Sequence, residues 1–259
     1  METICSHNET EAALEPAGTA RESAGQWGEF QRLNERRRAI RDFADSPVSD
    51  EDVQDLLKEA LLAPSSGNSQ PFVIHWLRDP ALKALAASAC RDQRAALTSL
   101  TLLVFVSGSR FARDTLSSFN AYVESTSELS EKSRAYHLRE AKIRRKFLQI
   151  APSAIWTPIH TLVSSVCPSL TLVPFGSAAV RNWAARNALF AAQTLMLAAS
   201  ARGLDSCPME GFNPMKLATL LCLKRGDVIP LVIALGRKRS DIRIEPRWRR
   251  SFDEAVKVH

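Results

Sequence analysis

The sequence has none of the short motifs that mark hydrolases, metalloenzymes and nucleotide-binding enzymes. It contains no G-x-S-x-G, H-E-x-x-H, Walker or G-x-G-x-x-G pattern. His75 and His160 have neither a nucleophile nor a metal ligand at motif spacing. The five cysteines lack C-x-x-C and zinc-ligand spacing, which is typical of free thiols in a reducing cytoplasm. These absences predict no metal site and give no support to hydrolase chemistry.

Two further absences concern the compartment of the protein. The N-terminus carries acidic residues and lacks the basic and apolar segments of a signal peptide, so we expect a cytoplasmic protein. Residues 147–180 contain no Asp, Glu, Lys or Arg, and this length would permit a membrane span. Prolines interrupt the stretch at positions 152, 158, 168 and 174, which argues against a spanning helix. We expect instead an apolar connector or lid, packed on the body of the protein or on a partner subunit.

Nucleic-acid binding also lacks support. The formal net charge is +6, but the basic residues gather at 36–41, 139–146 and 237–250, and no long basic tail exists. Such short clusters are typical of local anion sites or solvated faces more than of a nucleic-acid footprint.

The 259 residues include 45% hydrophobic side chains, enough to bury a sizeable core. Residues 1–26 are rich in Ala, Glu, Ser and Thr without periodicity and predict a disordered or loosely docked tail. We expect residues 27–259 to form a single domain, with a variable lid or connector region at about 110–180.

Hydrophobic periodicity predicts the main elements. We expect helices over 27–38, after Ser49 as N-cap, in the second half of 110–146, over 183–202 with Gly203 just beyond its end, and over 213–223. Apolar runs predict buried strands at 72–77, 100–106 and 228–235. Residues 207–212 read as a turn, and 239–259 as an extended basic segment followed by a short helix.

The loop at Ala63–Phe72 (A-P-S-S-G-N-S-Q-P-F) is the most informative segment. It lies between a predicted helix and a predicted strand, where α/β proteins often hold ligands. Its hydroxyl and amide side chains can bind a polar, planar group, and Gly67 permits close approach of the backbone. It contains no acid, base or metal ligand, so it is suited to binding and not to attack.

Two arginine-rich segments are candidates for a phosphate site. Arg36–Arg41 places several guanidinium groups within six residues, and Arg247–Arg250 is a second cluster. Arginine offers planar, forked donors that match phosphate oxygens. In an extended segment Arg37, Ala39 and Arg41 would share one face. A solvated basic face, or pairing with surface acids, is the alternative for each segment.

In their order and spacing these segments resemble the nitroreductase family of FMN flavoproteins. The resemblance rests on R-R-A-I-R-D-F (37–43), the loop 63–72, residues 183–212 with C-P-M-E-G-F at their end, and I-P-L-V-I-A-L-G (229–236). It covers roughly Phe30 to Val256, with a loose middle at about 110–180.

The resemblance implies an α+β fold, with a central, mostly antiparallel sheet surrounded by helices. It implies an intertwined homodimer with two FMN sites at the interface, each built from both subunits. The FMN phosphate and ribityl chain would contact basic residues, and Arg41 would lie nearest the flavin ring. The basic set is Arg37, Arg38, Arg41, Arg247 and Arg249.

The same resemblance assigns the remaining site residues. Pro64, Ser65, Ser66 and Asn68 would reach the FMN of the opposite subunit. Pro208, Met209, Glu210 and Gly211 would line the isoalloxazine ring. Family members often carry a small hydroxyl residue where this chain has Ala39, so only backbone contact is expected there. A further contact with the ring edge falls on Asp92, Gln93 or Arg94, and the sequence does not choose among them.

The implied activity is reduction of nitroaromatic, quinone or similar small aromatic acceptors by NADH or NADPH, through FMN, in a ping-pong cycle of hydride transfers. The cofactor carries such chemistry, so no catalytic acid or base is expected. Two alternatives stay open. One is a flavoenzyme of the same fold with flavin-fragmenting, dehalogenating or dehydrogenating chemistry, and the other is a flavin-binding protein without turnover.

Overall fold

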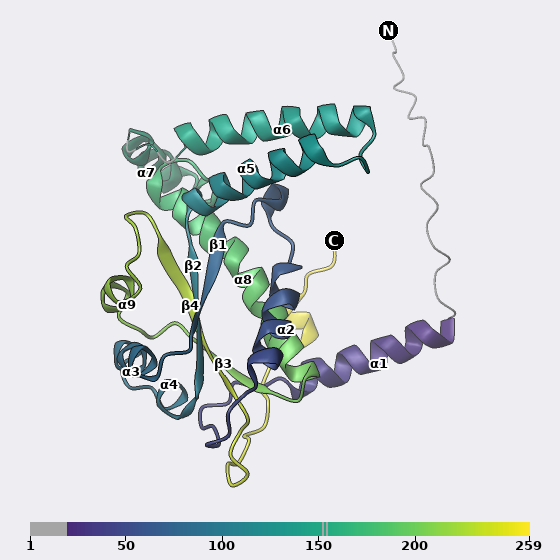
Figure 1. Ribbon diagram of the computed structural model, residues 1–259, viewed down its shortest axis with the longest axis vertical. Helices are drawn as coiled ribbons and strands as arrows, with labels where there is room; N and C mark the ends of the chain where they lie inside the picture. Colours follow the sequence, from purple (N-terminus) through teal and green to yellow (C-terminus); the bar gives the residue numbers. More distant parts are fainter. Residues whose placement is uncertain (1–19, 152, 154) are drawn as a thin grey trace. The chain divides into compact units, whose positions relative to one another are not determined.

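The computed structural model describes residues 20–151, 153 and 155–259 (Figure 1). The chain divides into two compact units after Arg36. The first unit contributes helix α1 (Ala20–Arg36), in which the rings of Trp27 and Phe30 stack with centroids 5.8 Å apart. Of the tail expected over 1–26, residues 1–19 lie outside the described residues and 20–26 are helical. The helix expected over 27–38 ends at Arg36, so Arg37 and Arg38 precede the sheet in non-helical backbone.

The second unit, Arg37–His259, is built on a sheet that has four strands among the described residues. They are β1 (Phe72–Leu77), β2 (Thr101–Ser107), β3 (Asp205–Met209) and β4 (Val228–Gly236), in the order β1-β2-β4-β3. All three pairings are antiparallel, and a single parallel bridge joins Ala39 to Ser206. The three predicted strands and the mostly antiparallel sheet are therefore confirmed.

Helices cover both faces of the sheet, and strand β2 shows why. Every residue of β2 is buried, and its side chains alternate between two cores because strand side chains have a period of two. Leu103 and Phe105 pack with α2 (Asp50–Leu61) and α8 (Ser177–Ala201). Leu102, Val104 and Val106 belong to the other core. Figure 1 shows α3 (Pro80–Ala89), α4 (Arg94–Thr98) and α9 (Pro214–Leu220) on that side.

Sequence signals fixed the ends of several helices. The Ser49 hydroxyl accepts a hydrogen bond from the backbone N–H of Asp52 at the start of α2, which satisfies one exposed donor of the first turn. Gly203 has a φ of 75° just beyond the end of α8, as expected of a residue in the left-handed cap. Asn213 caps α9 in the same way as Ser49 caps α2.

The middle of the chain is more helical than expected. The sequence predicts a helix in the second half of 110–146, and the structure forms two helices in this region, α5 (Ser109–Ser125) and α6 (Glu131–Ile150), which pack against each other. The apolar stretch continues as α7 (Trp156–Val166) and η2 (Pro168–Leu172), in contact with α8. No residue of α7 is buried. Within the described residues, no helix is long and apolar enough to cross a membrane.

The expected turn at 207–212 is wrong in its first half, because Cys207–Met209 belong to strand β3. Cys207 pairs with Ala234 and Met209 with Val232. Pro208 fits there because β3 is an edge strand, where a missing backbone N–H costs no ladder bond on the outer side. The turn itself begins at Glu210, whose carbonyl accepts a hydrogen bond from the Phe212 N–H at 3.0 Å. Beyond β4 the chain turns at Ser240 and Asp241 and then has neither helix nor strand until α10 (Phe252–Ala255), which is the short helix that the sequence predicted.

Candidate functional site

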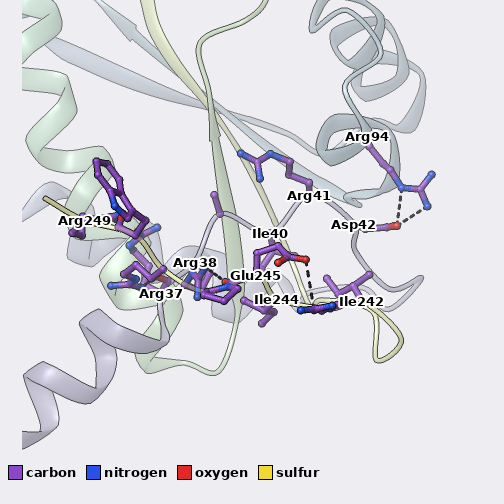
Figure 2. A pocket seen from close by; sticks show the side chains of 15 residues that line it. Arg37, Arg38, Ile40, Arg41, Asp42, Arg94, Ile242, Ile244, Glu245 and Arg249 are labelled. Carbon is purple, nitrogen blue, oxygen red and sulfur yellow. Dashed lines mark hydrogen bonds and ion pairs between the residues drawn. The ribbon is translucent and has the colours of Figure 1, made fainter.

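Two segments far apart in the sequence enclose a cleft of about 500 Å³ (Figure 2). One segment runs from Arg37 to Asp42 and the other from Ile242 to Arg249. The first is held along the outer edge of β3, because the Ile40 N–H donates to the Ser206 carbonyl at 3.1 Å and the Ile40 side chain enters the core. Residues on either side of Ile40 are thereby directed away from that core.

Arginine side chains tie the two segments together. Arg247 donates from Nη2 to the carbonyl of Arg37 at 2.5 Å, and Arg38 donates from Nη2 to the carbonyl of Glu245 at 2.5 Å. Figure 2 shows Arg37 and Arg249 at the same end of the cleft. In the described part of the chain, seven arginines line the cleft. They are Arg37, Arg38, Arg41, Arg94, Arg243, Arg247 and Arg249.

The electrostatics of the cleft favour an anion. Partial burial, with the positive charges of Arg247, Arg249 and Arg38, lowers the pKa of Arg37. Asp42 and Glu245 also line the cleft. Asp42 pairs with Arg94 at 2.5 Å, and Glu245 lies 3.6 Å from Arg243, so the two carboxylates face arginines other than Arg37.

Arg41 connects the cleft to strand β3. Burial raises the pKa of the Cys207 thiol, and the nearby positive charge of Arg41 opposes that rise. The charge of Arg41 therefore acts beside the strand that leads to Met209, Glu210 and Gly211. Met209 is buried, whereas Glu210 and Gly211 are exposed.

The backbone of the turn after β3 is fixed by Gln93. Its amide Nε2 donates to the carbonyl of Gly211 at 2.8 Å and to the carbonyl of Cys90 at 3.0 Å. Arg91 and Asp92, directly before it, have φ of 58° and 50°, a conformation that stores backbone strain in residues other than glycine. Among the three residues left open by the sequence, Gln93 contacts the turn and Arg94 lines the arginine cleft.

The loop after α2 has an unusual backbone. It contains the short 3-10 helix η1 (Ser66–Asn68). Gly67, Asn68 and Gln70 have positive φ values of 58°, 51° and 38°. The Ser65 hydroxyl accepts from the Gln70 N–H at 3.0 Å, which holds the turn closed. Pro64, Ser66, Gly67 and Asn68 are exposed. Of the four residues expected to contact FMN from this loop, Pro64, Ser66 and Asn68 are therefore exposed, whereas Ser65 is partly buried.

Two residues that sequence reasoning missed support this loop. The buried Asn187, on α8, accepts a hydrogen bond from the Ser66 N–H at its Oδ1 at 2.7 Å and donates from Nδ2 to the Trp183 carbonyl at 2.7 Å. Arg144, on α6, donates to the Gly67 carbonyl at 2.7 Å. An amide inside a long, largely apolar helix was the available signal for Asn187, since a buried polar group needs a partner. Nothing in the sequence distinguishes Arg144 from the other basic residues of α6.

The loop and the arginine cleft lie at opposite ends of the sheet. Phe72, next to the loop, pairs with Ser107, which pairs with Val228. Ala39 instead bridges Ser206, which pairs with Leu235 at the other end of β4. Val228 and Leu235 lie near the two ends of β4, seven residues apart, which corresponds to about 23 Å along the strand. A single chain therefore brings together Arg37–Arg41 with Arg247 and Arg249, but it does not bring the loop to them.

The sequence matches the family model described as the Nitroreductase family over residues 35–237. "NADH dehydrogenase" of Thermus thermophilus is 26% identical over 201 residues, which are 78% of this chain and 82% of that protein. Protein DrgA of Synechocystis is 29% identical over 207 residues, 80% of this chain and 82% of that protein. A protein of Exiguobacterium sibiricum solved in complex with FMN has the same fold, with a TM-score of 0.71 at 19% identity, over 89% of this chain and 97% of that one. The matched range includes the loop, Arg37–Arg41 and the turn after β3, whereas Arg247 and Arg249 lie beyond it.

Proposed function

The chain belongs to the nitroreductase family, and on that premise we propose that it binds FMN and passes a hydride from NADH or NADPH to an electron-poor acceptor. The relatives named above support an oxidoreductase, and the solved complex of one structural neighbour supports the choice of FMN.

The arginine cleft carries this proposal. Arg37, Arg38, Arg247 and Arg249 bring their positive charges close together, which costs free energy, and the carboxylates of the cleft, Asp42 and Glu245, face other arginines. A phosphate monoester carries a charge of about −1.5 to −2 at neutral pH and accepts forked hydrogen bonds from guanidinium groups. Binding such a group would relieve the crowding. The donor set therefore fits the phosphate end of FMN.

The chain's own residues contribute position and electrostatics. Bound FMN would supply hydride acceptance and donation. Gln93 fixes the carbonyl of Gly211 and thus the turn that the family resemblance assigns to the ring. Arg41 adds a positive charge beside β3, where it would stabilise negative charge on a neighbouring group. These residues would orient bound FMN and polarise its ring, and none of them is proposed to transfer a proton.

We further propose that the complete site needs two copies of the chain. The loop Ser65–Asn68 and the arginine cleft lie at opposite ends of one sheet, so the loop of one copy would serve the FMN held by the cleft of the other. The exposure of Ser66 and Asn68 supports a role toward a partner.

The proposed acceptor is a nitroaromatic or a quinone, which would use the same place as the nicotinamide in turn. A cavity of about 520 Å³ beside the loop supports an aromatic acceptor. Asn68 and Gln70 line one part of it, and Phe119 and Tyr122 from α5 line another. Aromatic walls favour a flat ligand because rings stack in offset or edge-to-face arrangements.

Anaerobic titration tests the proposal. The purified protein, after incubation with FMN, should retain the flavin and be bleached by NADH or NADPH, and a nitroaromatic or a quinone should restore the colour. A protein that fails to retain added FMN would contradict the proposal at its first step. Retention of FMN without bleaching by NADH or NADPH would contradict the proposed hydride transfer from the nucleotide to the flavin.

A further inference from the structure

A separate, smaller cavity of about 150 Å³ lies inside one chain, between the loop before β1 and helices α5, α6 and α8. Its walls are mostly apolar and partly aromatic. They include Leu116, Phe147, Leu148, Pro174 and Trp183. None of the arginines of the cleft contributes to it. A dry cavity of about this volume with similar walls is known to hold a benzene ring.

One polar side chain in the wall of the cavity lacks a hydrogen-bond partner. Ser69 is 4% exposed, and its hydroxyl has no hydrogen-bond partner among the described residues. A buried hydroxyl without a partner costs free energy, so native structures rarely leave one unpaired. Ser69 lines the cavity, but its hydroxyl oxygen is itself enclosed, so an acceptor atom of a ligand would satisfy it after a rotation of the side chain toward the cavity.

Arg144 gives the same wall a positive charge. Its guanidinium lies against Gly67, where an added Cβ would come within 2.9 Å of Cζ, and it donates to the Gly67 carbonyl. Its ion pair with Glu140 is long, at 3.9 Å, and both side chains are about one-third exposed. A pair of this kind neutralises the charge weakly. An anionic group in the cavity would meet both the Arg144 charge and the Ser69 hydroxyl.

We propose that this cavity is a binding site for a single-ring aromatic anion, of which benzoate is the simplest example. The ring packs among Phe147, Leu148 and Trp183, and the carboxylate accepts hydrogen bonds from Ser69 and Arg144. One chain forms all of these walls, so binding needs no second copy. Ser66 and Gly67 of the loop proposed to serve the partner's FMN also line the cavity, so its occupancy is tested on FMN-free protein.

The geometry sets a preference among ligands. Toluene has the ring but no acceptor, so it would leave the Ser69 hydroxyl unpaired and gain nothing from Arg144. We expect benzoate to bind at least tenfold more tightly than toluene, since a hydrogen bond to a charged group is worth more than a neutral one.

Titration of FMN-free protein with benzoate and with toluene tests the proposal. Trp183 lines the cavity, so benzoate should change the tryptophan fluorescence in a saturable manner, and Trp183→Phe should remove most of that change. Calorimetry on the same samples gives the affinities directly. Arg144→Gln should weaken benzoate about tenfold and leave toluene unchanged, because only the anion uses the charge. Arg145→Gln, at an exposed neighbouring position that does not line the cavity, is the matched control and should change neither affinity.

Two results would show that benzoate does not bind in this cavity. No saturable binding of benzoate, or equal losses in Arg144→Gln and Arg145→Gln, would overturn the site. Ser69→Ala should cost benzoate about fivefold, and an unchanged affinity in this variant would remove Ser69 from the site. A urea unfolding curve for each variant separates lost binding from lost folding. Since the assay contains no flavin, its failure leaves the FMN proposal standing, and the converse also holds.

Discussion

At the scale of single residues, the arginine cleft shows a conflict between folding and binding. Arg37 lies half-buried, and burial together with the positive charges of Arg247, Arg249 and Arg38 lowers its pKa. Packing alone gives no reason to gather such charges. A bound anion explains the cluster, because it would stabilise these positive charges in the complex, although they repel one another in the folded protein without it.

The first prediction follows from that conflict. Arg37→Ala together with Arg249→Ala should weaken FMN binding by about a hundredfold or more, since each of the two lost charge-assisted hydrogen bonds is worth about 1.5–3 kcal/mol. The remaining binding should depend less on ionic strength than that of the parent. Fluorescence quenching of FMN at low and high salt measures both effects. Unfolding in urea should not come earlier in the variant, because the charges it removes repel one another.

Arg225→Ala is the matched control, because Arg225 is exposed in the turn before β4 and does not line the cleft. It should leave both the FMN affinity and its salt dependence unchanged. An equal loss in this control would mean that net charge, and not the cleft, holds the flavin.

His75, in β1, gives a prediction about pH. Burial lowers its pKa in the folded protein, the positive charge of Arg110 lowers it further, and Asp227 opposes both. The unfolded chain therefore binds a proton at His75 at a higher pH than the folded protein does. The free energy of unfolding should fall as pH drops from about 7 through the ordinary histidine pKa near 6.5. The contribution of His75 to this change should end below the lowered pKa of His75 in the folded protein.

Urea midpoints of the parent and of His75→Gln, measured between pH 5 and pH 8, check this expectation. The glutamine variant should show a shallower loss toward acid pH. His259→Gln, at the exposed C-terminus, serves as the control and should follow the parent. Identical acid profiles for the parent and His75→Gln would show that other groups set the pH dependence.

At the scale of elements, the loop after α2 depends on helix α8. The N–H of Ser66 is held by the side chain of Asn187, which is 4% exposed. Asn187→Leu should destabilise the protein by about 1–3 kcal/mol, because it leaves that N–H without its buried acceptor and adds a mismatched side chain. It should also weaken FMN retention through the loop. Urea unfolding and flavin content measure the two effects.

Asn120→Leu is the matched control at another amide on a helix, in α5. It should leave flavin content unchanged, whatever it does to stability. Flavin content that stays at the parent level in Asn187→Leu would mean that the loop does not need this support.

The sequence predicted those elements whose signals are local. Apolar runs located β1, β2 and β4, and Ser49 and Gly203 located the ends of α2 and α8. Strand β3 escaped prediction because it is short, contains Pro208 and exists only through its pairing with β4. The first half of 110–146 was missed for a similar reason. Helix α5 becomes stable through its packing on α6 and on the sheet, which no local pattern reveals.

The site was predictable in part. Composition suggested two basic segments, but only the fold shows that Arg247 hydrogen-bonds the backbone of Arg37. Contacts such as Gln93 with Gly211 and Asn187 with Ser66 join residues more than a hundred positions apart, and single-sequence patterns carry no such pairing. The roles of Arg37–Arg41, Ser65–Asn68 and Pro208–Gly211 in holding FMN stay predictions.

At the scale of the whole molecule, the register of the sheet separates the two halves of the proposed FMN site. The loop stands at the end marked by Phe72 and Ser107, and the arginine cleft at the end marked by Ser206 and Leu235. A rigid sheet keeps these ends apart. The proposed FMN site therefore requires a second copy of the chain, whose loop would complete the site of the first.

Complementation between two defective variants tests this central claim most directly. One variant carries Arg37→Ala and Arg249→Ala in the cleft, and the other carries Ser66→Trp and Asn68→Trp in the loop. Each alone should retain little FMN. Co-expressed with different tags and purified as a mixed dimer, the pair would contain one site with both defects and one site with neither. We expect one FMN per mixed dimer, reducible by NADH or NADPH. A mixed dimer that holds no FMN, or a protein that is a monomer with FMN bound, would contradict this claim.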